Sequence, residues 1–151
     1  MDPLRPYGGA VVLDNSAWAR TLDGRVRGQL REQFEQALAN GELWTCPPAL
    51  LEMRFSGRDR DGFLGTAREL SALPHAPLTS AAADAAVRAQ EELALAPGVS
   101  HRVKPVDLLI AAVAASEGIG VLHYDGDYDT IAEHTSLRFA SVWVAERGSI
   151  D

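Results

Sequence analysis

Short runs of β-branched and aromatic residues alternate with longer helical segments along this chain, and this alternation limits the folds that it can adopt. Strands that are joined by helices favour a parallel sheet, because each helix returns the chain to the end of the sheet where the previous strand began. The expected strands are GGAVVLD, ELWTC, GVLHY and FASVWVA. Helices are expected over residues 16–22, 24–40, 47–55, 59–72, 79–94, 105–117 and 127–134. The pattern predicts an α/β fold, namely a three-layer α/β/α, Rossmann-like domain with a mostly parallel central sheet.

Length and composition agree with one such domain over residues 1–151, of which 46% are hydrophobic. Residues 1–9 are expected to be a flexible N-terminal extension. No apolar run is long enough to span a bilayer, and the first residues do not resemble a signal peptide. The single Cys46 has no partner for an internal disulfide, so we expect a cytoplasmic protein in which this thiol is a buried small hydrophobe.

Four acidic residues stand in otherwise apolar surroundings: Asp14, Glu52, Asp107 and Asp125. A carboxylate beside a core-forming run is unfavourable unless a positive charge or hydrogen bonds compensate it. Asp14 and Asp125 follow two expected strands, at the edge where ligands collect in open α/β sheets. Carboxylate oxygens are the ligands that Mg²⁺ and Mn²⁺ prefer, and such ions lower the pKa of water and neutralise phosphate charge. The four acids therefore predict a divalent-metal site, in which crowded carboxylates raise one another's pKa values.

Each acid also has a simpler interpretation. Asp14 and Asp125 can begin turns or cap the following helices, and Glu52 can be an edge glutamate whose stem lies on apolar surface. Asp107 benefits from the dipole at the third position of its helix. That benefit does not explain a carboxylate on a helix that is apolar nearly all round, so Asp107 points most strongly to function.

Other types of site fit the sequence poorly. The segment from Asp125 begins like a calcium loop, but Thr130 and Ser136 occupy the positions where such a loop has Gly and Glu. The four histidines lack zinc-site spacing, and there is no GxSxG, Walker or GxGxxG motif. An Asp-nucleophile phosphatase would have a second Asp at the position of Ser16.

The net charge of −7 argues against general adhesion to nucleic acid, yet basic residues are clustered locally. Such clusters can be solvated faces or ion-pair partners. Two of them nevertheless flank proposed ligands, which suits a metal together with a phosphate backbone. The expected RNA contacts in these clusters are Arg54, Arg58, Arg102 and Lys104.

Five segments in order resemble the PIN-domain ribonucleases, and among them the VapC toxins of bacterial toxin–antitoxin modules. The segments are VVLDNSAW, LLEMRFSG, HRVKPVDLLIAAVA, VLHYDGDYDTIA and VWVAERGSI. The resemblance covers residues 11–150 and implies a PIN-like fold. The long segment before the first strand and Asn15, where Thr is common, depart from the family pattern without touching the acids.

The resemblance implies an Mg²⁺- or Mn²⁺-dependent endoribonuclease. Asp14 and Asp107 would then be the principal metal ligands, Glu52 would orient or activate the attacking water, and Asp125 would bind metal directly or through water. Two further residues would support the site, Ser16 as the hydroxyl residue after the first acid and Asp127 as a competitor of Asp125 for the fourth position.

The resemblance also implies three partners. They are a cognate VapB-type antitoxin whose C-terminal segment occupies the active-site groove, a second copy of the chain in a homodimer, and an RNA substrate such as tRNA or rRNA. Two other functions stay open: a non-catalytic PIN-fold module that binds RNA or protein, and a structure-specific DNA nuclease.

Overall fold

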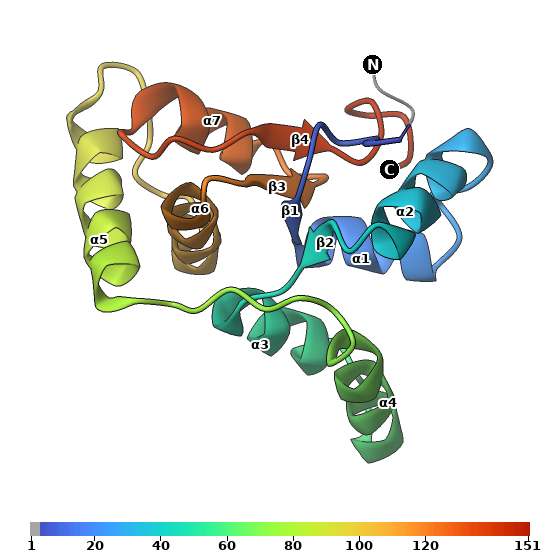
Figure 1. The fold of residues 1–151 in the computed structure, drawn as a ribbon. Coiled ribbons are helices and arrows are strands. Elements are labelled where there is room, and N and C mark those ends of the chain that lie inside the picture. Colours follow the sequence, from blue (N-terminus) through green and yellow to red (C-terminus); the bar gives the residue numbers. More distant parts are fainter. Residues whose placement is uncertain (1–3) are drawn as a thin grey trace.

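A central parallel sheet surrounded by helices forms the framework of the protein in the computed structural model, which describes residues 4–151 (Figure 1). The elements follow in the order β1 (Val11–Leu13), α1 (Asn15–Leu22), α2 (Gln29–Ala39), β2 (Leu43–Trp44), α3 (Pro47–Phe55), α4 (Arg60–Leu70), α5 (Ser80–Leu95), α6 (Pro105–Glu117), β3 (Gly120–His123), α7 (Asp127–His134) and β4 (Ser141–Trp143).

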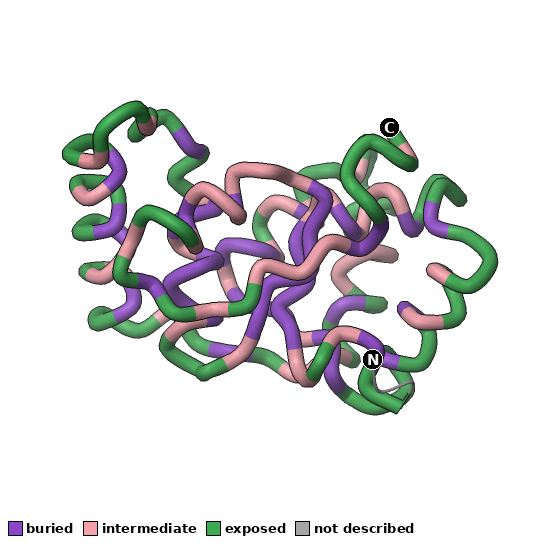
Figure 2. The backbone as a smooth tube through the Cα atoms, turned by 90° about the horizontal axis from the view of Figure 1, so that it is seen from above, coloured by how far each residue is buried: buried purple, intermediate pink, exposed green. Residues whose placement is uncertain are grey.

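The sheet has the strand order β2-β1-β3-β4, and all of its pairings are parallel. Val12 aligns with Val121 where β1 pairs with β3, the two strands at the centre. Every residue of these two strands is buried, as expected for strands covered on both faces. Buried segments accordingly run through the middle of the molecule in Figure 2, and exposed segments lie towards its ends. The predicted three-layer α/β fold with a parallel sheet is confirmed.

Local signals explain most helix ends. Pro47 and Pro105 begin α3 and α6, since proline suits a first helical position. Gly118 adopts a left-handed conformation (φ 70°) after α6, and the Thr79 side chain caps α5. The predicted extents of these helices are therefore close to the observed ones.

The expected start of the second helix at residue 24 is wrong, because α2 begins only at Gln29. Gly24 and Gly28 both have positive φ (84° and 62°), a conformation incompatible with a continuous helix. Val26 contributes to the core, as its apolar character indicated, but it does so from the loop.

The segment that precedes β1 contacts the body of the protein. The Arg5 guanidinium donates to Glu42 Oε2 at 3.1 Å, and Pro6 is buried. Residues 1–3 of the expected flexible extension lie outside the described residues. Within residues 4–151, no helix combines the length and the apolar character that a membrane crossing needs.

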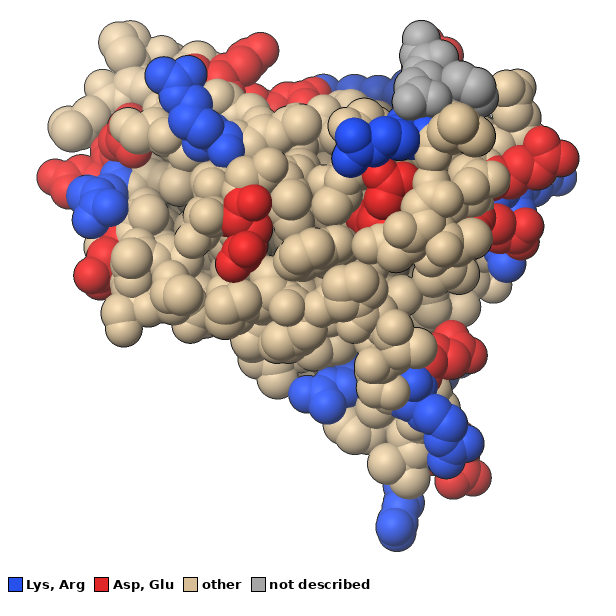
Figure 3. Space-filling model, viewed as in Figure 1, with Lys and Arg blue, Asp and Glu red and all other residues tan. Residues whose placement is uncertain are grey.

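Helices α3 and α4 project from the body as a two-helix arm (Figure 1). The basic side chains of this arm, all of them arginine, lie along it in Figure 3. Four of its apolar side chains are also exposed, namely Leu51, Phe55, Phe63 and Leu64. The arm thus offers both charge and apolar surface beside the sheet.

Candidate metal centre

The acids of interest meet at the carboxyl edge of the sheet. Asp14 follows β1, Asp125 follows β3, and Asp107 occupies the first turn of α6. Carboxylate oxygens of Asp14, Glu52 and Asp107 lie within 4.8 Å of one another, and those of Asp107, Asp125 and Asp127 form a second such group. Asp107 belongs to both groups, so the structure brings all four predicted acids, together with Asp127, into one cluster.

Asp14 is held by hydrogen bonds to both of its oxygens. The Ser16 backbone N–H donates to Oδ2 at 2.9 Å, and the Ser16 hydroxyl donates to the same oxygen. The Tyr124 backbone N–H in turn donates to Ser16 Oγ at 2.8 Å. Ser16 therefore ties the acid after β1 to the chain that leaves β3, and Asp14 also serves as the N-cap of α1.

Tyr128 is a site residue that the sequence analysis missed. Its fully buried hydroxyl donates to Asp14 Oδ1 at 2.8 Å and lies 3.3 Å from Asp107 Oδ1. It thus spans the two acids that were expected to be the principal ligands. A tyrosine in a short amphipathic helix has the same pattern as a core residue, so no signal in the sequence distinguished it.

Asp107 is the most strongly perturbed acid of the cluster. Burial, followed by the charges of Asp14 and Asp125, raises the pKa of Asp107 to about 8, although Lys104 opposes the shift. Its Oδ2 is buried and has no hydrogen-bond partner among residues 4–151. A buried carboxylate that is crowded by other carboxylates and has one unpaired oxygen fits a divalent cation, which would supply the missing positive charge.

The charges around Asp107 act on its neighbours as well. Burial and the charge of Asp14 raise the pKa of Glu52, and burial and the charge of Asp125 raise that of Asp127. Lys104 Nζ lies 3.9 Å from Asp125 Oδ2, and although partial burial opposes it, the charges of Asp107 and Asp125 raise the Lys104 pKa. The carboxyl groups of Glu52 and Asp127 therefore release their protons at higher pH than isolated carboxyl groups do.

A neutral histidine supports the cluster from β3. Burial lowers the pKa of His123 to about 4, and its ring stacks on Tyr128 at 4.8 Å. Its Nδ1 accepts from the Asp125 backbone N–H at 3.1 Å, and Nε2 lies 2.7 Å from Ser141 Oγ. Asp129 accepts hydrogen bonds from Ser141 and Trp143. Asp129 therefore positions His123 and β4, whereas Asp125 and Asp127 belong to the cluster.

Comparison with known proteins agrees with this arrangement. Residues 11–134 match the model of the PIN domain. The chain belongs to the PIN-domain family. It is 32% identical to Ribonuclease VapC18 of Mycobacterium tuberculosis over 139 residues, which cover 91% of this chain and 97% of that relative. It is 36% identical to Ribonuclease VapC21 of the same species over 140 residues, covering 91% and 96% of the two chains.

A solved structure shares the fold of this PIN domain. It is a member of the VapBC family of toxin–antitoxin systems, VapBC-5 from Mycobacterium tuberculosis, and it superposes with a TM-score of 0.61 at 26% identity. The match covers 89% of this chain and 99% of that chain. The expected membership of the PIN and VapC families is therefore confirmed.

The basic residues that were expected to contact RNA lie at different places on this PIN domain. Lys104 is next to Asp125, whereas Arg58 and Arg102 are exposed. Arg54 lies over the Phe63 ring, 5.5 Å from its centroid, where α3 meets α4. Only Lys104 among these four forms an ion pair with a cluster acid that the structure describes.

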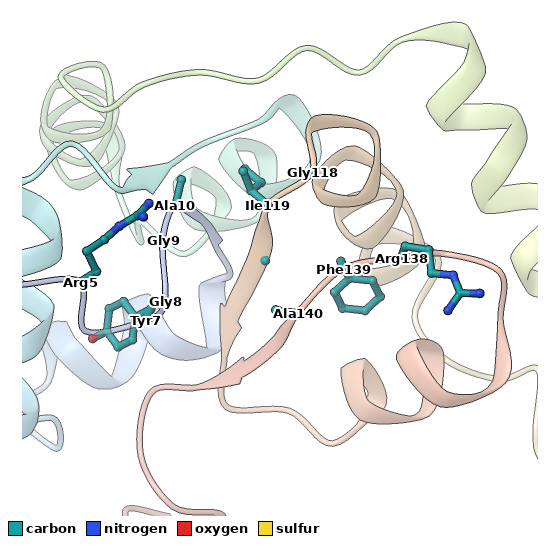
Figure 4. Close-up of a pocket in the computed structure, with 11 residues that line it drawn as sticks. Arg5, Tyr7, Gly8, Gly9, Ala10, Gly118, Ile119, Arg138, Phe139 and Ala140 are labelled. Atoms are coloured by element: carbon teal, nitrogen blue, oxygen red, sulfur yellow. The ribbon is translucent and has the colours of Figure 1, made fainter. Parts of the chain in front are cut away.

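A cavity of about 510 Å³ lies at the opposite, amino end of the sheet (Figure 4). Glycine backbone and the side chains of Arg5, Tyr7, Arg138 and Phe139 line it. Among residues 4–151 its lining includes no carboxylate, histidine or cysteine that could bind a metal ion, so we assign the candidate site to the acidic cluster.

Replacing Tyr128 with Phe should weaken Mn²⁺ binding about tenfold while leaving the fold intact, because only the hydroxyl that orients Asp14 is lost. Isothermal titration with Mn²⁺ measures this change. Tyr124→Phe is the matched control, since the Tyr124 hydroxyl accepts from the Ile150 backbone N–H and does not touch an acid. Equal affinities of the Tyr128→Phe protein and the wild type would show that the hydroxyl does not orient the ligands.

Proposed function

We propose that this PIN domain is an Mg²⁺- or Mn²⁺-dependent endoribonuclease and the toxin of a VapBC-type toxin–antitoxin module. The observation that carries the proposal is the clustering of acids in two sets of three, both of which include Asp107. One carboxylate oxygen of Asp107 is buried without a hydrogen-bond partner among the described residues. Two relatives with the name ribonuclease, each matched over more than nine-tenths of this chain, support the reaction class.

Each residue of the cluster has a role in this proposal. Asp14 and Asp107 hold the metal, and Asp125 and Asp127 complete the site from the other side of Asp107. The bound ion supplies Lewis-acid chemistry, which lowers the pKa of water and neutralises charge on the phosphate. Glu52, half-buried and with a raised pKa, orients the attacking water and accepts its proton.

Supporting residues keep these groups in place. Ser16 and Tyr128 fix the two oxygens of Asp14, which leaves the carboxylate little freedom to rotate. Lys104 lies next to Asp125 at the exposed side of the cluster, where its ammonium group can approach a phosphate of the substrate. The protein thus holds its ligands before the metal and the RNA arrive.

Metal removal tests the proposal. Excess EDTA should reduce cleavage of a structured RNA by at least about a hundredfold, and added Mg²⁺ or Mn²⁺ should restore it, because carboxylates alone cannot neutralise the phosphate. Gel analysis of tRNA and rRNA fragments gives the rates, and DNA of the same sequence serves as the comparison substrate. Cleavage that EDTA leaves unchanged contradicts the metal role.

The same assay separates the two other functions. Metal-dependent cleavage of DNA but not RNA would identify a DNA nuclease. Binding of RNA without cleavage under every metal condition would identify a non-catalytic module. The presence of all four acids in one cluster favours catalysis over that module.

We further propose a VapB-type antitoxin, a homodimer and a cytoplasmic location, as is appropriate for a toxin that acts on tRNA or rRNA. The solved relative from a VapBC toxin–antitoxin system supports the antitoxin. The α3–α4 arm has exposed apolar side chains, among them Phe55 at 87% exposure, that suit an antitoxin segment. Exposed Val87 and Leu95 on α5 offer apolar surface to a second copy.

A further inference from the structure

Two arginines and two aromatic rings form a continuous row at the carboxyl ends of β3 and β4. The Arg20 guanidinium lies over the Tyr124 ring, 4.5 Å from its centroid. Tyr124 meets Trp143 edge to face, with ring centroids 5.5 Å apart, and the Arg147 guanidinium lies 5.5 Å from the Trp143 centroid. Both cations are therefore held against aromatic faces, which restricts their side-chain freedom.

Arg147 lies directly against the loop that carries two cluster acids. A Cβ at Gly126 would lie 2.9 Å from one guanidinium nitrogen of Arg147 and 3.1 Å from its central carbon. Gly126 stands between Asp125 and Asp127, yet Arg147 forms no ion pair with any carboxylate of residues 4–151. Its N–H donors are consequently available to an external anion beside the cluster.

Arg20 occupies the other end of the row and is tied to the residue that holds Asp14. One of its terminal nitrogens donates to the Ser16 backbone carbonyl at 3.0 Å. Its Nε is buried without a hydrogen-bond partner among the described residues. Arg147 therefore lies beside the loop that carries Asp125 and Asp127, and Arg20 contacts the residue that holds Asp14.

A planar guanidinium whose orientation is fixed by an aromatic ring is suited to a phosphodiester, with which it forms two parallel hydrogen bonds. Neither arginine forms an ion pair with a carboxylate of residues 4–151, although the protein has an excess of acidic residues and a net charge of −7. We propose that Arg147, together with Arg20, binds the phosphates of single-stranded RNA that adjoin the cleaved bond. This inference rests on the proposed ribonuclease function and adds a subsite to it.

Steady-state cleavage of a single-stranded RNA in Mg²⁺ tests the subsite, with rates measured over a range of salt concentrations. Arg147→Ala should raise KM about five- to tenfold and change kcat little, because one phosphate contact is lost. The slope of log(kcat/KM) against log[salt] should fall in magnitude by about 0.7, the value for one phosphate of a single strand. A purely structural role of Arg147 would not change this slope.

Gly126→Ala provides a second variant that removes no charge. The three atoms nearest to the new Cβ all belong to the flexible end of Arg147, and Gly126 has φ −61°, which alanine adopts readily. Gly126→Ala should displace the guanidinium and raise KM, as Arg147→Ala does. The double variant should have the same KM as Arg147→Ala alone. Arg138→Ala is the control, since Arg138 is exposed at the amino end of the sheet.

The outcomes separate this inference from the function on which it rests. Metal-dependent RNA cleavage whose KM and salt slope are the same in the wild type, Arg147→Ala and Gly126→Ala would overturn the subsite alone. A lower Tm in Arg147→Ala with an unchanged salt slope would also overturn it, in favour of a structural role. A wild-type protein that cleaves no RNA would overturn the ribonuclease proposal and the subsite together.

Discussion

Asp107→Asn should reduce metal-dependent RNA cleavage by at least about a thousandfold, because Asp107 is the acid that belongs to both sets of clustered carboxylates. Asparagine retains the size of the side chain and a carbonyl oxygen near Tyr128, but it removes the charge that binds the cation. Initial rates at saturating Mg²⁺ with one RNA substrate measure the loss. Raising the Mg²⁺ concentration should not restore the rate.

Asp84→Asn is the matched control for this substitution. Asp84 lies exposed on α5, outside both carboxylate groups, so the same chemical change should leave cleavage within about twofold of the wild type. If Asp107→Asn cleaves RNA as fast as Asp84→Asn does, the reaction does not depend on the acidic cluster.

The same substitution should stabilise the metal-free protein at alkaline pH. The pKa of Asp107 is about 8 in the folded chain against an ordinary value of 3.8, so between these pH values the folded state holds a proton that the unfolded state has released. The stability contributed by the protonated carboxyl is thus present at low pH and is lost as pH rises through about 8. For one proton the free energy of unfolding falls by roughly 4 kcal/mol between pH 5 and pH 8. Asp107→Asn does not undergo this decrease, because its amide does not titrate.

Thermal unfolding in EDTA checks this prediction. The Tm of Asp107→Asn should be close to that of the wild type at pH 5 and about 8 °C higher at pH 8. His123 changes stability in the opposite direction, since its lowered pKa makes both proteins less stable as pH falls from 6.5 to about 4, and comparing them at one pH cancels this effect. A Tm difference that is the same at both pH values would mean that the Asp107 carboxyl is already ionised in the folded protein.

The positions of the main acids could be predicted from the sequence for a simple physical reason. Asp14 and Asp107 interrupt or border apolar runs, and a carboxylate is tolerated there only when something compensates its charge. Parallel strands end at the same edge, so the acids that follow β1 and β3 had to be close. The sequence left the choice between Asp125 and Asp127 open, and the structure brings both close to Asp107.

Other features depend on contacts between distant segments and left no local signal. Tyr128 reaches Asp14 across 114 positions of the chain, and its ring has the pattern of an ordinary core residue. Arg147 comes against Gly126 only because β4 pairs with β3 and carries the C-terminal segment past the acidic loop. The start of α2 was mispredicted because the prediction rested on apolar residues at helical spacing. The positive φ of Gly24 and Gly28, which prevents a helix there, is visible only in the structure.

Titration of Mn²⁺ into the wild type and into Asp107→Asn at pH 7.5 tests the central claim, a divalent-metal site built around Asp107, most directly. The wild type should bind Mn²⁺ at a saturable site and release most of one proton, because its Asp107 carboxyl with a pKa of about 8 must ionise. Asp107→Asn should bind at least about tenfold more weakly and release no such proton. Equal affinity and equal proton release in the two proteins would contradict the claim.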